Sequence, residues 1–317
     1  MRYCIGVDLG GTNIAIGLID LDGKVILHKK SVKTRAPRPC EEISADIKDV
    51  CLALCEREGI TLDDVEWIGV ATPGIVRSGV VISAVNLGWT NEKFGQIVSG
   101  LTGRPTFVAN DANAAAYAEA KWGCGVGEHS LIAVTLGTGI GGGIILDGKI
   151  WEGFNGFAAE LGHMVIDVGG RRCSCGLRGC LEAYCSASAL VHETRRMMKL
   201  YPDSLMWQVV NGDIERVDGR TAFSANSMGD FAARQIIDDF VNYLAIGIAN
   251  IINVFQPSVV CIGGGISGQG DDLMRPLRER LKYTSFGTKD MRTRVEAAVY
   301  RNDAGIIGAG LLGIMED

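Results

Sequence analysis

The chain carries the same glycine-rich pattern twice, over residues 7–24 and again over residues 134–149. Each copy reads as a strand, a glycine turn, a second strand and an Asp-Gly-Lys hairpin. The copies lie much farther apart than the ~20–50 residues that separate solenoid repeats. The pattern therefore predicts two homologous α/β halves. A chance echo is the alternative, because the chain has 43 glycines among its 317 residues.

Composition and charge narrow the class of protein. Hydrophobic residues make up 47% of the chain and charged residues 21%, which is ordinary for a globular protein. The net charge is −6 and no basic run is present, so nucleic acid is not an expected partner. The first twenty residues show no secretory signal, and the longest apolar run, residues 244–255, is too short to span a bilayer. We expect a cytoplasmic protein without a membrane partner.

Hydrophobic periodicity and turn residues predict strands and helices along the whole chain. The expected strands are a hairpin over residues 3–20 and segments over residues 24–30, 66–71, 105–109 and 259–262. The expected helices cover residues 41–58, an alanine-rich stretch ending at Trp122, and residues 186–200, 228–255 and 304–315. Residues 201–227 read as mixed helix and loop.

The two glycine turns suit the binding of phosphate. Glycines let backbone N–H groups approach an anion, and the hydroxyls of Thr12 and Thr138 add donors. Asp8 precedes the first turn, where its carboxylate could hold Mg²⁺ through water. A third glycine run, Gly263-Gly264-Gly265, follows a strand. Two tight hairpins without a ligand are the alternative, and neither a Walker A pattern nor G-x-G-x-x-G opening a helix occurs at these turns.

Asn110 and Asp111 stand between an expected strand and an expected helix. Both residue types are favoured helix caps, which is the structural alternative. A carboxylate at the carboxyl end of a strand also lies where α/β sheets bind ligands. Phosphoryl transfer to a hydroxyl needs such a base to take the proton. The two roles are compatible.

A cluster of metal-ligand residue types follows the second repeat. His163, Cys173, Cys175 and Cys180 fall within 18 residues and suit tetrahedral zinc, although C-x-C-x₄-C is not zinc-finger spacing. Four protein ligands leave no open position, so the expected zinc is structural. Ten cysteines in a cytoplasmic chain favour thiols or metal ligands over disulfides, and a loop of free thiols is the alternative.

Two carboxylates flank this cluster. Glu160 precedes His163 by three residues, and Glu182 follows Cys180 by two. A metal that binds the cluster would fix both, and carboxylates and imidazole are good partners for sugar hydroxyls. Solvated surface acids are the alternative.

Together these motifs resemble the ROK family of sugar kinases and repressors, and within it the bacterial ATP-dependent glucokinases. The resemblance covers essentially the whole chain. Residues 8–13 look like the family's first phosphate motif, residues 136–143 like its second, and residues 263–267 like its adenosine-side motif. Glu160-Leu-Gly-His163 is similar to the family's E-x-G-H, and the three cysteines to its zinc ligands. Asn13 often corresponds to lysine in relatives.

The resemblance implies an actin-like, ribonuclease-H-like duplicated α/β fold of two domains with a cleft between them. The expected small domain comprises residues 1–109 and 303–317, closed by the C-terminal helix. The expected large domain comprises residues 110–302 and carries the zinc loop.

The resemblance also implies transfer of the γ-phosphoryl group of MgATP to the 6-hydroxyl of glucose, with Asp111 as base. The residues expected to bind the hexose are Gly74, Asn110, Asp111, Glu160, His163 and Glu182. The residues expected to bind the nucleotide are Asp8, Gly10, Gly11, Thr12, Asn13, Gly137, Thr138, Gly139, Gly264 and Gly265. The implied partners are ATP and a hexose, the implied metals are Mg²⁺ and structural Zn²⁺, and a homodimer or homotetramer is expected.

Other functions stay open. Mannose, N-acetylmannosamine, allose or fructose could replace glucose as the substrate. A sugar-sensing ROK repressor is a remote alternative, because such regulators carry a helix-turn-helix before the first phosphate motif, which here begins at residue 8. An actin-like ATPase or chaperone partner would have no use for E-x-G-H and the zinc cluster.

Overall fold

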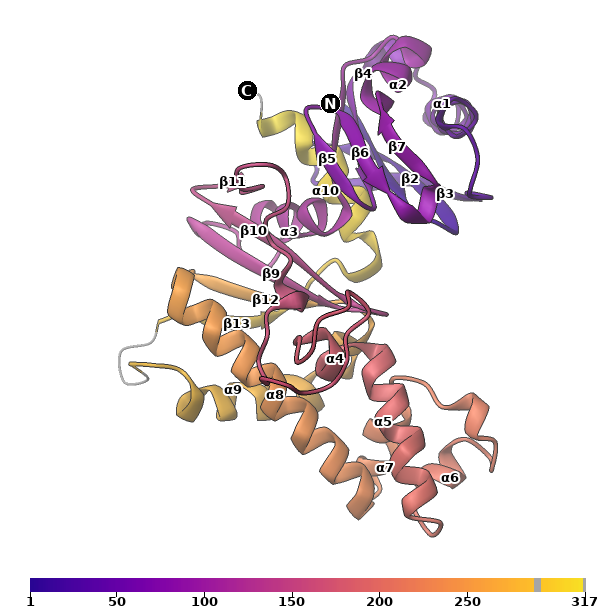
Figure 1. The fold of residues 1–317 in the computed structure, drawn as a ribbon. Coiled ribbons are helices and arrows are strands. Elements are labelled where there is room, and N and C mark those ends of the chain that lie inside the picture. The colour runs from indigo at the N-terminus through magenta and orange to yellow at the C-terminus, as the bar shows by residue number, and fades with distance from the viewer. Residues whose placement is uncertain (288–291, 316–317) are drawn as a thin grey trace. The chain divides into compact units, whose positions relative to one another are not determined.

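The two glycine-turn repeats open two five-stranded sheets with the same topology. The computed structural model, which describes residues 1–287 and 292–315, also contains a three-stranded sheet (Figure 1). The first sheet has the order β3-β2-β1-β4-β8, formed by Val25–Lys33, Asn13–Asp20, Tyr3–Leu9, Val65–Thr72 and Thr106–Asn110. The second has the order β11-β10-β9-β12-β13, formed by Lys149–Ile150, Ile140–Leu146, Ser130–Leu136, Val259–Gly263 and Arg294–Ala297. Numbered within its own sheet, each order is third-second-first-fourth-fifth, so the predicted duplication of an α/β half is confirmed.

The pairing directions repeat as well. In the first sheet β1 pairs with β2 in antiparallel fashion and with β4 in parallel, and β4 pairs with β8 in parallel. In the second sheet β12 pairs in parallel with both β9 and β13. The carboxyl ends of the parallel strands therefore share one edge in each sheet, and this edge is where α/β sheets bind ligands.

The chain divides into two compact units. The first comprises Met1–His129, Gly143–Ala159 and Asn302–Asp317, and the second comprises Ser130–Gly142 and Glu160–Arg301. Strand β10 begins in the second unit and ends in the first. The expected domains, with their boundary after residue 109, stay a proposal. The compact units divide the chain differently, because α3 and the end of the β10–β11 hairpin belong to the first unit.

The first unit packs helices against its five-stranded sheet. These helices are α1 (Cys40–Glu58), α2 (Phe94–Thr102), α3 (Asp111–Lys121) and α10 (Ala304–Leu311). Helix α1 buries Ile43, Ile47 and Leu54 in the core. Helix α10 contacts β1 and β4 closely, since a Cβ at Gly6 would lie 1.9 Å from a carbonyl oxygen of α10. Glycine is therefore required where this helix crosses the strand.

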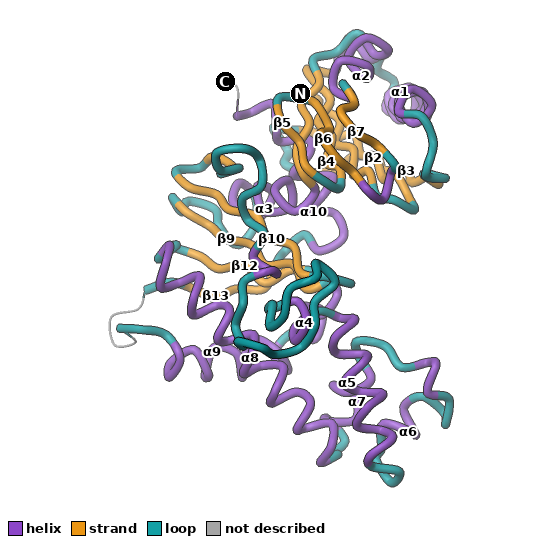
Figure 2. The backbone as a smooth tube through the Cα atoms, viewed as in Figure 1, coloured by secondary structure: helices purple, strands orange, loops and turns teal. Residues whose placement is uncertain are grey.

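The second unit gathers its helices around α8 (Phe231–Phe255). The others are α4 (Glu182–Cys185), α5 (Ala187–Leu200), α6 (Met206–Val209), α7 (Thr221–Ser227) and α9 (Asp271–Thr284), most of which surround α8 in Figure 2. By length and composition α8 is the one described helix that could cross a membrane, but 61% of its most apolar window is buried inside the protein. Its burial against α4, α5, α7 and α9 fits a core helix.

Most of the elements predicted from the sequence are present within a few residues of their expected bounds. Residues 201–227 are mixed helix and loop, as expected. Sequence patterns did not predict α2, α9, β13 or the three-stranded sheet of β5 (Ile75–Arg77), β6 (Val80–Ala84) and β7 (Trp89–Glu92). Short 3₁₀ turns occur at Leu62–Asp64, Val85–Leu87, Leu161–His163, Ile214–Arg216, Gly265–Gln269, Arg301–Asp303 and Leu312–Met315.

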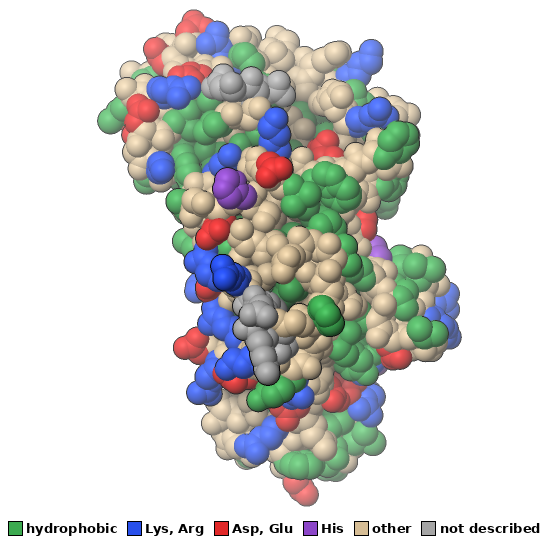
Figure 3. Space-filling view, turned by 90° about the vertical axis from the view of Figure 1, so that its left-hand side faces the viewer, with side chains coloured by type: hydrophobic (Ala, Val, Ile, Leu, Met, Phe, Trp, Pro, Cys, Tyr) green, Lys and Arg blue, Asp and Glu red, His purple; other side chains and the backbone are tan. Residues whose placement is uncertain are grey.

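The surface charges are mixed in sign. On the face drawn in Figure 3, Lys and Arg side chains are interspersed with Asp and Glu. The excess of acidic residues, which gives the chain its net charge of −6, therefore forms no single acidic patch on this face.

Candidate active site

The first glycine turn joins β1 to β2 and is held in place by hydrogen bonds from Thr34, which lies outside the turn. The Gly10 amide donates to the carbonyl of Asn13 (2.9 Å), which closes the turn. The buried Thr34 donates its hydroxyl to the carbonyl of Gly10 (2.6 Å), and its amide donates to the carbonyl of Thr12 (2.9 Å). The side chains of Thr12 and Asn13 are left exposed. The turn is thus held in place while its polar groups face outward.

Two carboxylates lie at the carboxyl edge of the first sheet. Asp8 stands near the end of β1, and Asp111 follows the end of β8, two strands away. Burial raises the pKa of Asp8 to about 6, and the charge of Asp111 adds to this effect. Asp111 itself is exposed, and its Oδ1 accepts from the Ala112 amide at 2.8 Å. A partly buried acid with a raised pKa and an exposed acid at the same edge can serve two different chemical roles.

Asn110 connects this edge to a glycine turn. Its side-chain oxygen caps α3 by accepting from the amides of Ala112 (2.9 Å) and Asn113 (3.2 Å), so the expected cap is present. Its Nδ2 donates to the carbonyl of Gly74 (2.9 Å). Gly74 has φ +92°, and a Cβ there would lie 2.0 Å from the Ser83 carbonyl. The Gly74 turn is therefore held against the residue that precedes Asp111.

The second glycine turn, between β9 and β10, is bound by α4 and α5. The Ala187 amide donates to the carbonyl of Gly137 (2.8 Å), and the Ser188 hydroxyl donates to that of Thr138 (2.8 Å). Glu182 accepts from the Ile140 amide at 2.9 Å, and a Cβ at Gly139 would lie 2.4 Å from this carboxylate. This turn is in direct contact with Glu182.

The third glycine run follows β12, which pairs with β9. Gly264 has φ +81°, and a Cβ there would lie 2.5–2.6 Å from backbone atoms of Leu136. Gly265, by contrast, has open space around its α-carbon. Residues 137–139 and 264–265 therefore lie at the same edge of the second sheet, where backbone amides could face an anion.

The four predicted metal ligands come together. The ligand atoms of His163, Cys173, Cys175 and Cys180 all lie within 4.8 Å of one another. Sγ of Cys175 lies 3.8 Å from Sγ of Cys180, and Sγ of Cys173 lies 3.7 Å from Nδ1 of His163. Zn–S bonds of ~2.3 Å in a tetrahedron place donor atoms about 3.7 Å apart. The cluster has the donors and the spacing for Zn²⁺.

The residues between His163 and the start of α4 form a folded loop, the Cys-rich loop (residues 164–181). The Leu181 amide donates to the Met164 carbonyl (2.9 Å), and the Ile166 amide donates to that of Gly179 (2.8 Å). A Cβ at Gly179, whose φ is +83°, would lie 1.8 Å from the Asp167 carbonyl. The backbone therefore closes the loop independently of the four ligands.

The two flanking carboxylates occupy different environments. Glu160 is exposed, and its Oε2 lies 4.0 Å from Nε2 of His163. Since Nδ1 of His163 faces Cys173, one ring nitrogen could bind a metal while the other faces Glu160. Glu182 accepts from Ser174 at 2.9 Å as well as from the Ile140 amide. Glu182 thus links the Cys-rich loop to the second glycine turn.

The predicted site residues fall into two groups. The first unit brings together residues 8–13, Gly74, Asn110 and Asp111. The second unit brings together residues 137–139, Glu160, His163, Glu182, the three cysteines and residues 264–265.

Several supporting residues were missed by the sequence analysis. They are Thr34, Asp167, Arg171, Ser174, Tyr184, Ser188 and Gly305. Of these, only Ser188 had a readable signal, because serines at the start of a helix often cap it or bind nearby carbonyls. The contacts of Thr34 and Tyr184 join segments that only the tertiary fold brings together.

A cavity of about 860 Å³ adjoins the second glycine turn. Its lining includes Thr138, Glu182 and, from α5, His192 and Arg196. It lies wholly within the second unit.

The duplicated sheet topology and the glycine turns define an actin-like, ribonuclease-H-like α/β protein. The sequence model of the ROK family matches residues 4–315, and the chain belongs to this family. It is 38% identical over 308 residues to the glucokinase of Thermotoga maritima, covering 96% of this chain and 95% of that one.

Two further relatives show the range of the family. The ROK family glucokinase from Streptomyces griseus, solved in complex with glucose and AMPPNP, is 34% identical, with a TM-score of 0.81 and coverage of 98% of each chain. The xylose repressor of Caldicellulosiruptor bescii is 31% identical over 309 residues, which are 96% of this chain and 76% of the repressor. The family therefore includes both kinases and regulators at similar levels of identity.

Proposed function

We propose that this protein is a sugar kinase, and specifically an ATP-dependent glucokinase that phosphorylates the 6-hydroxyl of glucose. The observation that carries the proposal is the pair of carboxylates at the carboxyl ends of β1 and β8, with Asp111 exposed and Asp8 partly buried and raised in pKa. The choice of glucose rests on the named function of the Thermotoga and Streptomyces relatives.

In the proposed reaction Asp111 is the general base. Its exposed carboxylate takes the proton of the sugar's 6-hydroxyl while that oxygen bonds to the γ-phosphorus and ADP leaves. The bond that Asp111 accepts from the Ala112 amide, together with the Asn110 cap of α3, fixes the start of the helix that carries it. The residues proposed to hold the hexose are Gly74, Asn110, Asp111, Glu160, His163 and Glu182.

The glycine turns are proposed to bind the nucleotide. Residues 10–13 and 137–139 offer amides and the hydroxyls of Thr12 and Thr138 to the phosphates, and residues 264–265 lie on the adenosine side. Asp8 fits Mg²⁺ held through water, because its carboxyl is ionised above a pKa of about 6. Mg²⁺ held there would supply positive charge that neutralises the phosphates.

The Cys-rich cluster is proposed to hold one structural zinc. Cys173, Cys175 and Cys180 would bind it through sulfur, and His163 through Nδ1, since that nitrogen lies 3.7 Å from Cys173. The metal would fix the orientation of His163 relative to Glu160. We also propose a cytoplasmic location and a homodimer or homotetramer, and sedimentation of the purified protein tests the assembly.

A panel of sugars in a coupled ADP-release assay tests the substrate. Glucose should give the highest kcat/KM, ahead of mannose, N-acetylmannosamine, allose and fructose. The Asp111→Asn variant, purified in parallel, controls for a contaminating kinase. A higher kcat/KM for another hexose would reassign the substrate.

A sugar-responsive regulator is the second candidate, because the xylose repressor matches 96% of this chain. Such a protein would bind a sugar without turning it over. Calorimetry that shows sugar binding, in a sample that releases no ADP with any sugar of the panel, would favour this candidate.

A further inference from the structure

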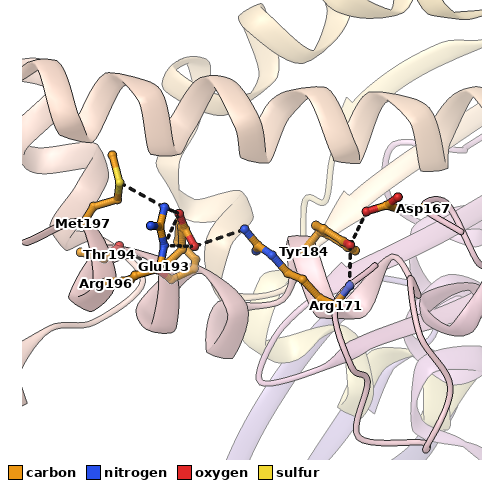
Figure 4. A network of polar contacts seen from close by, with 8 residues as sticks. Asp167, Arg171, Tyr184, Glu193, Thr194, Arg196 and Met197 are labelled. Carbon is orange, nitrogen blue, oxygen red and sulfur yellow. Dashed lines mark hydrogen bonds and ion pairs between the residues drawn. The ribbon is translucent and has the colours of Figure 1, made fainter. Parts of the chain in front are cut away.

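Tyr184 belongs to a polar network that joins the Cys-rich loop to α4 and α5 (Figure 4). Its hydroxyl donates to Oδ2 of Asp167 at 2.6 Å and accepts from the amide of Arg171 at 2.8 Å. One buried phenol therefore holds the loop at two points, since Tyr184 is only 4% exposed. Tyr184 belongs to α4, the same short helix that begins with Glu182.

The aromatic ring of Tyr184 contacts two further side chains. It packs against the ring of Tyr243 on α8, with the ring centroids 4.2 Å apart. The guanidinium carbon of Arg171 lies 4.8 Å from its ring centroid. Stacking and cation–π contacts of this kind restrict the ring to one position.

Arg171 extends the network to α5. Its guanidinium donates to Glu193 at 3.2 Å, and Arg196 binds the same carboxylate at 2.6 Å (Figure 4). Glu193 is largely buried, and the Arg196 hydrogen bond, followed by the charge of Arg171, lowers its pKa. The carboxylate is therefore ionised at neutral pH and keeps Arg171 in place.

The backbone of the Cys-rich loop packs tightly against the Tyr184 hydroxyl at Gly170. A Cβ at Gly170 would lie 2.1 Å from the Tyr184 hydroxyl and 2.4 Å from Oδ2 of Asp167. Such distances are too short for any side chain, so the loop approaches the hydroxyl as closely as a glycine allows. The network is thus sensitive to a change of one atom on either side.

We propose that Tyr184 is a positioning residue for hexose binding, which sets the place of Glu182 and of the Cys-rich loop through its hydroxyl. Glu182 lies one helical half-turn away on α4 and receives Ser174 of the loop at 2.9 Å. A loop that shifts at Asp167 and Arg171 shifts Ser174 and the metal ligands with it. This inference rests on the proposed sugar-binding roles of Glu182 and His163.

The test compares three variants in the full-length, metal-loaded protein. Tyr184→Phe removes only the hydroxyl, and Gly170→Ala disturbs the same contact without removing a polar group. Both should raise the KM for glucose about tenfold, near the lower end of the losses seen when outer partners of metal ligands are removed. Both kcat and the KM for ATP should stay within threefold of the wild-type values. A raised KM for glucose with an unchanged kcat shows that the variant has lost binding energy common to the ground state and the transition state. Tyr243→Phe is the matched control, because among the described residues its hydroxyl has no hydrogen bond, and its ring stays stacked.

A second readout does not depend on turnover. Hydrogen exchange of the loop amides should be faster in Tyr184→Phe than in wild type, while the zinc content stays at one per chain. A glucose KM within twofold of wild type in both variants would overturn the inference, as would unchanged exchange in the loop. A lower kcat together with higher KM values for both glucose and ATP and a lower Tm would also overturn the inference, because these changes would show a general loss of structure. If the wild-type protein phosphorylates no sugar, the proposed function fails, and loop exchange alone decides whether Tyr184 orders the loop.

Discussion

The negative charge of Asp111 acts on the carboxyl group of Asp8 at the carboxyl edge of the first sheet. Burial raises the pKa of Asp8 to about 6, and the negative charge of Asp111 adds to the shift. A Cβ at Gly305 would lie 2.5 Å from Oδ2 of Asp8, so the start of α10 closes the space around this carboxylate. An ionised Asp8 is thus costly in the free protein, and a bound cation would relieve that cost.

Replacement of this carboxylate should stabilise the protein. An acid whose pKa is higher in the folded than in the unfolded chain costs stability above its folded pKa, and this cost declines as the pH falls from the folded pKa to the unfolded one. At pH 8, Asp8→Asn should therefore raise the free energy of unfolding by ~1–3 kcal/mol, since one pKa unit corresponds to about 1.4 kcal/mol. In urea unfolding the gain should be nearly constant from pH 8 to about pH 7 and shrink between about pH 6 and pH 4, because the pKa of Asp8 is raised from 3.8 to about 6. The exposed Asp203→Asn should show no such pH-dependent gain, and a variant at Asp8 that is less stable at pH 8 would refute the expectation.

The base assignment gives a kinetic prediction. Asp111→Asn should lower kcat by ~10²–10⁴-fold, the usual loss when a general base is removed. Glucose binding should be largely intact, because the bonds of Asn110 to Gly74 and to the helix amides do not involve the Asp111 side chain. Single-turnover rates and calorimetry with glucose measure the two quantities. Retention of more than a tenth of the wild-type kcat would show that another group takes the proton.

Features with a recognisable pattern over a short stretch of sequence could be predicted. The glycine turns, the Asn110 cap and the four metal-ligand residue types have fixed spacings along the chain, and the structure brings each set together. The long helices α1 and α8 follow from hydrophobic periodicity over several turns. Local patterns of this strength survive in the fold because tertiary packing agrees with them.

The missed features depend on contacts between distant segments. Strands β5 and β6 are short, and their three-stranded sheet has no strong alternation of polar and apolar residues. The roles of Tyr184 and Thr34 arise from partners that local patterns cannot place, because Thr34 lies 24 residues from Gly10. Nothing in the local sequence distinguishes Gly305 from other helix glycines, because its contact with Asp8 exists only in the folded chain.

Metal content tests the Cys-rich cluster. The wild-type protein should copurify with one zinc per chain, and Cys175→Ala should lose the metal and bind glucose more weakly. Cys175 is exposed, so the change removes a ligand without opening a cavity in the core. Elemental analysis and glucose calorimetry report the two effects.

A cysteine outside the cluster supplies the control for that experiment. Cys55 is buried on α1, and Cys55→Ala should cost some stability while the zinc content stays at one per chain. A metal-free wild-type protein with full activity would exclude a zinc requirement.

The contact between Gly139 and Glu182 gives the last prediction. A Cβ at residue 139 would lie 2.4 Å from Oε2 of Glu182, the same oxygen that accepts from the Ile140 amide. In Gly139→Ala the carboxylate must move, so the KM for glucose should rise about tenfold or more, as it does when a positioned binding group is displaced. Gly268→Ala in the same unit is the matched control, because a Cβ there has open space, and both KM values should stay within twofold of wild type. Steady-state kinetics with glucose and ATP varied separately, together with Tm values to confirm folding, measure the effect. A well-folded Gly139→Ala enzyme with an unchanged glucose KM would show that the position of Glu182 does not govern hexose binding.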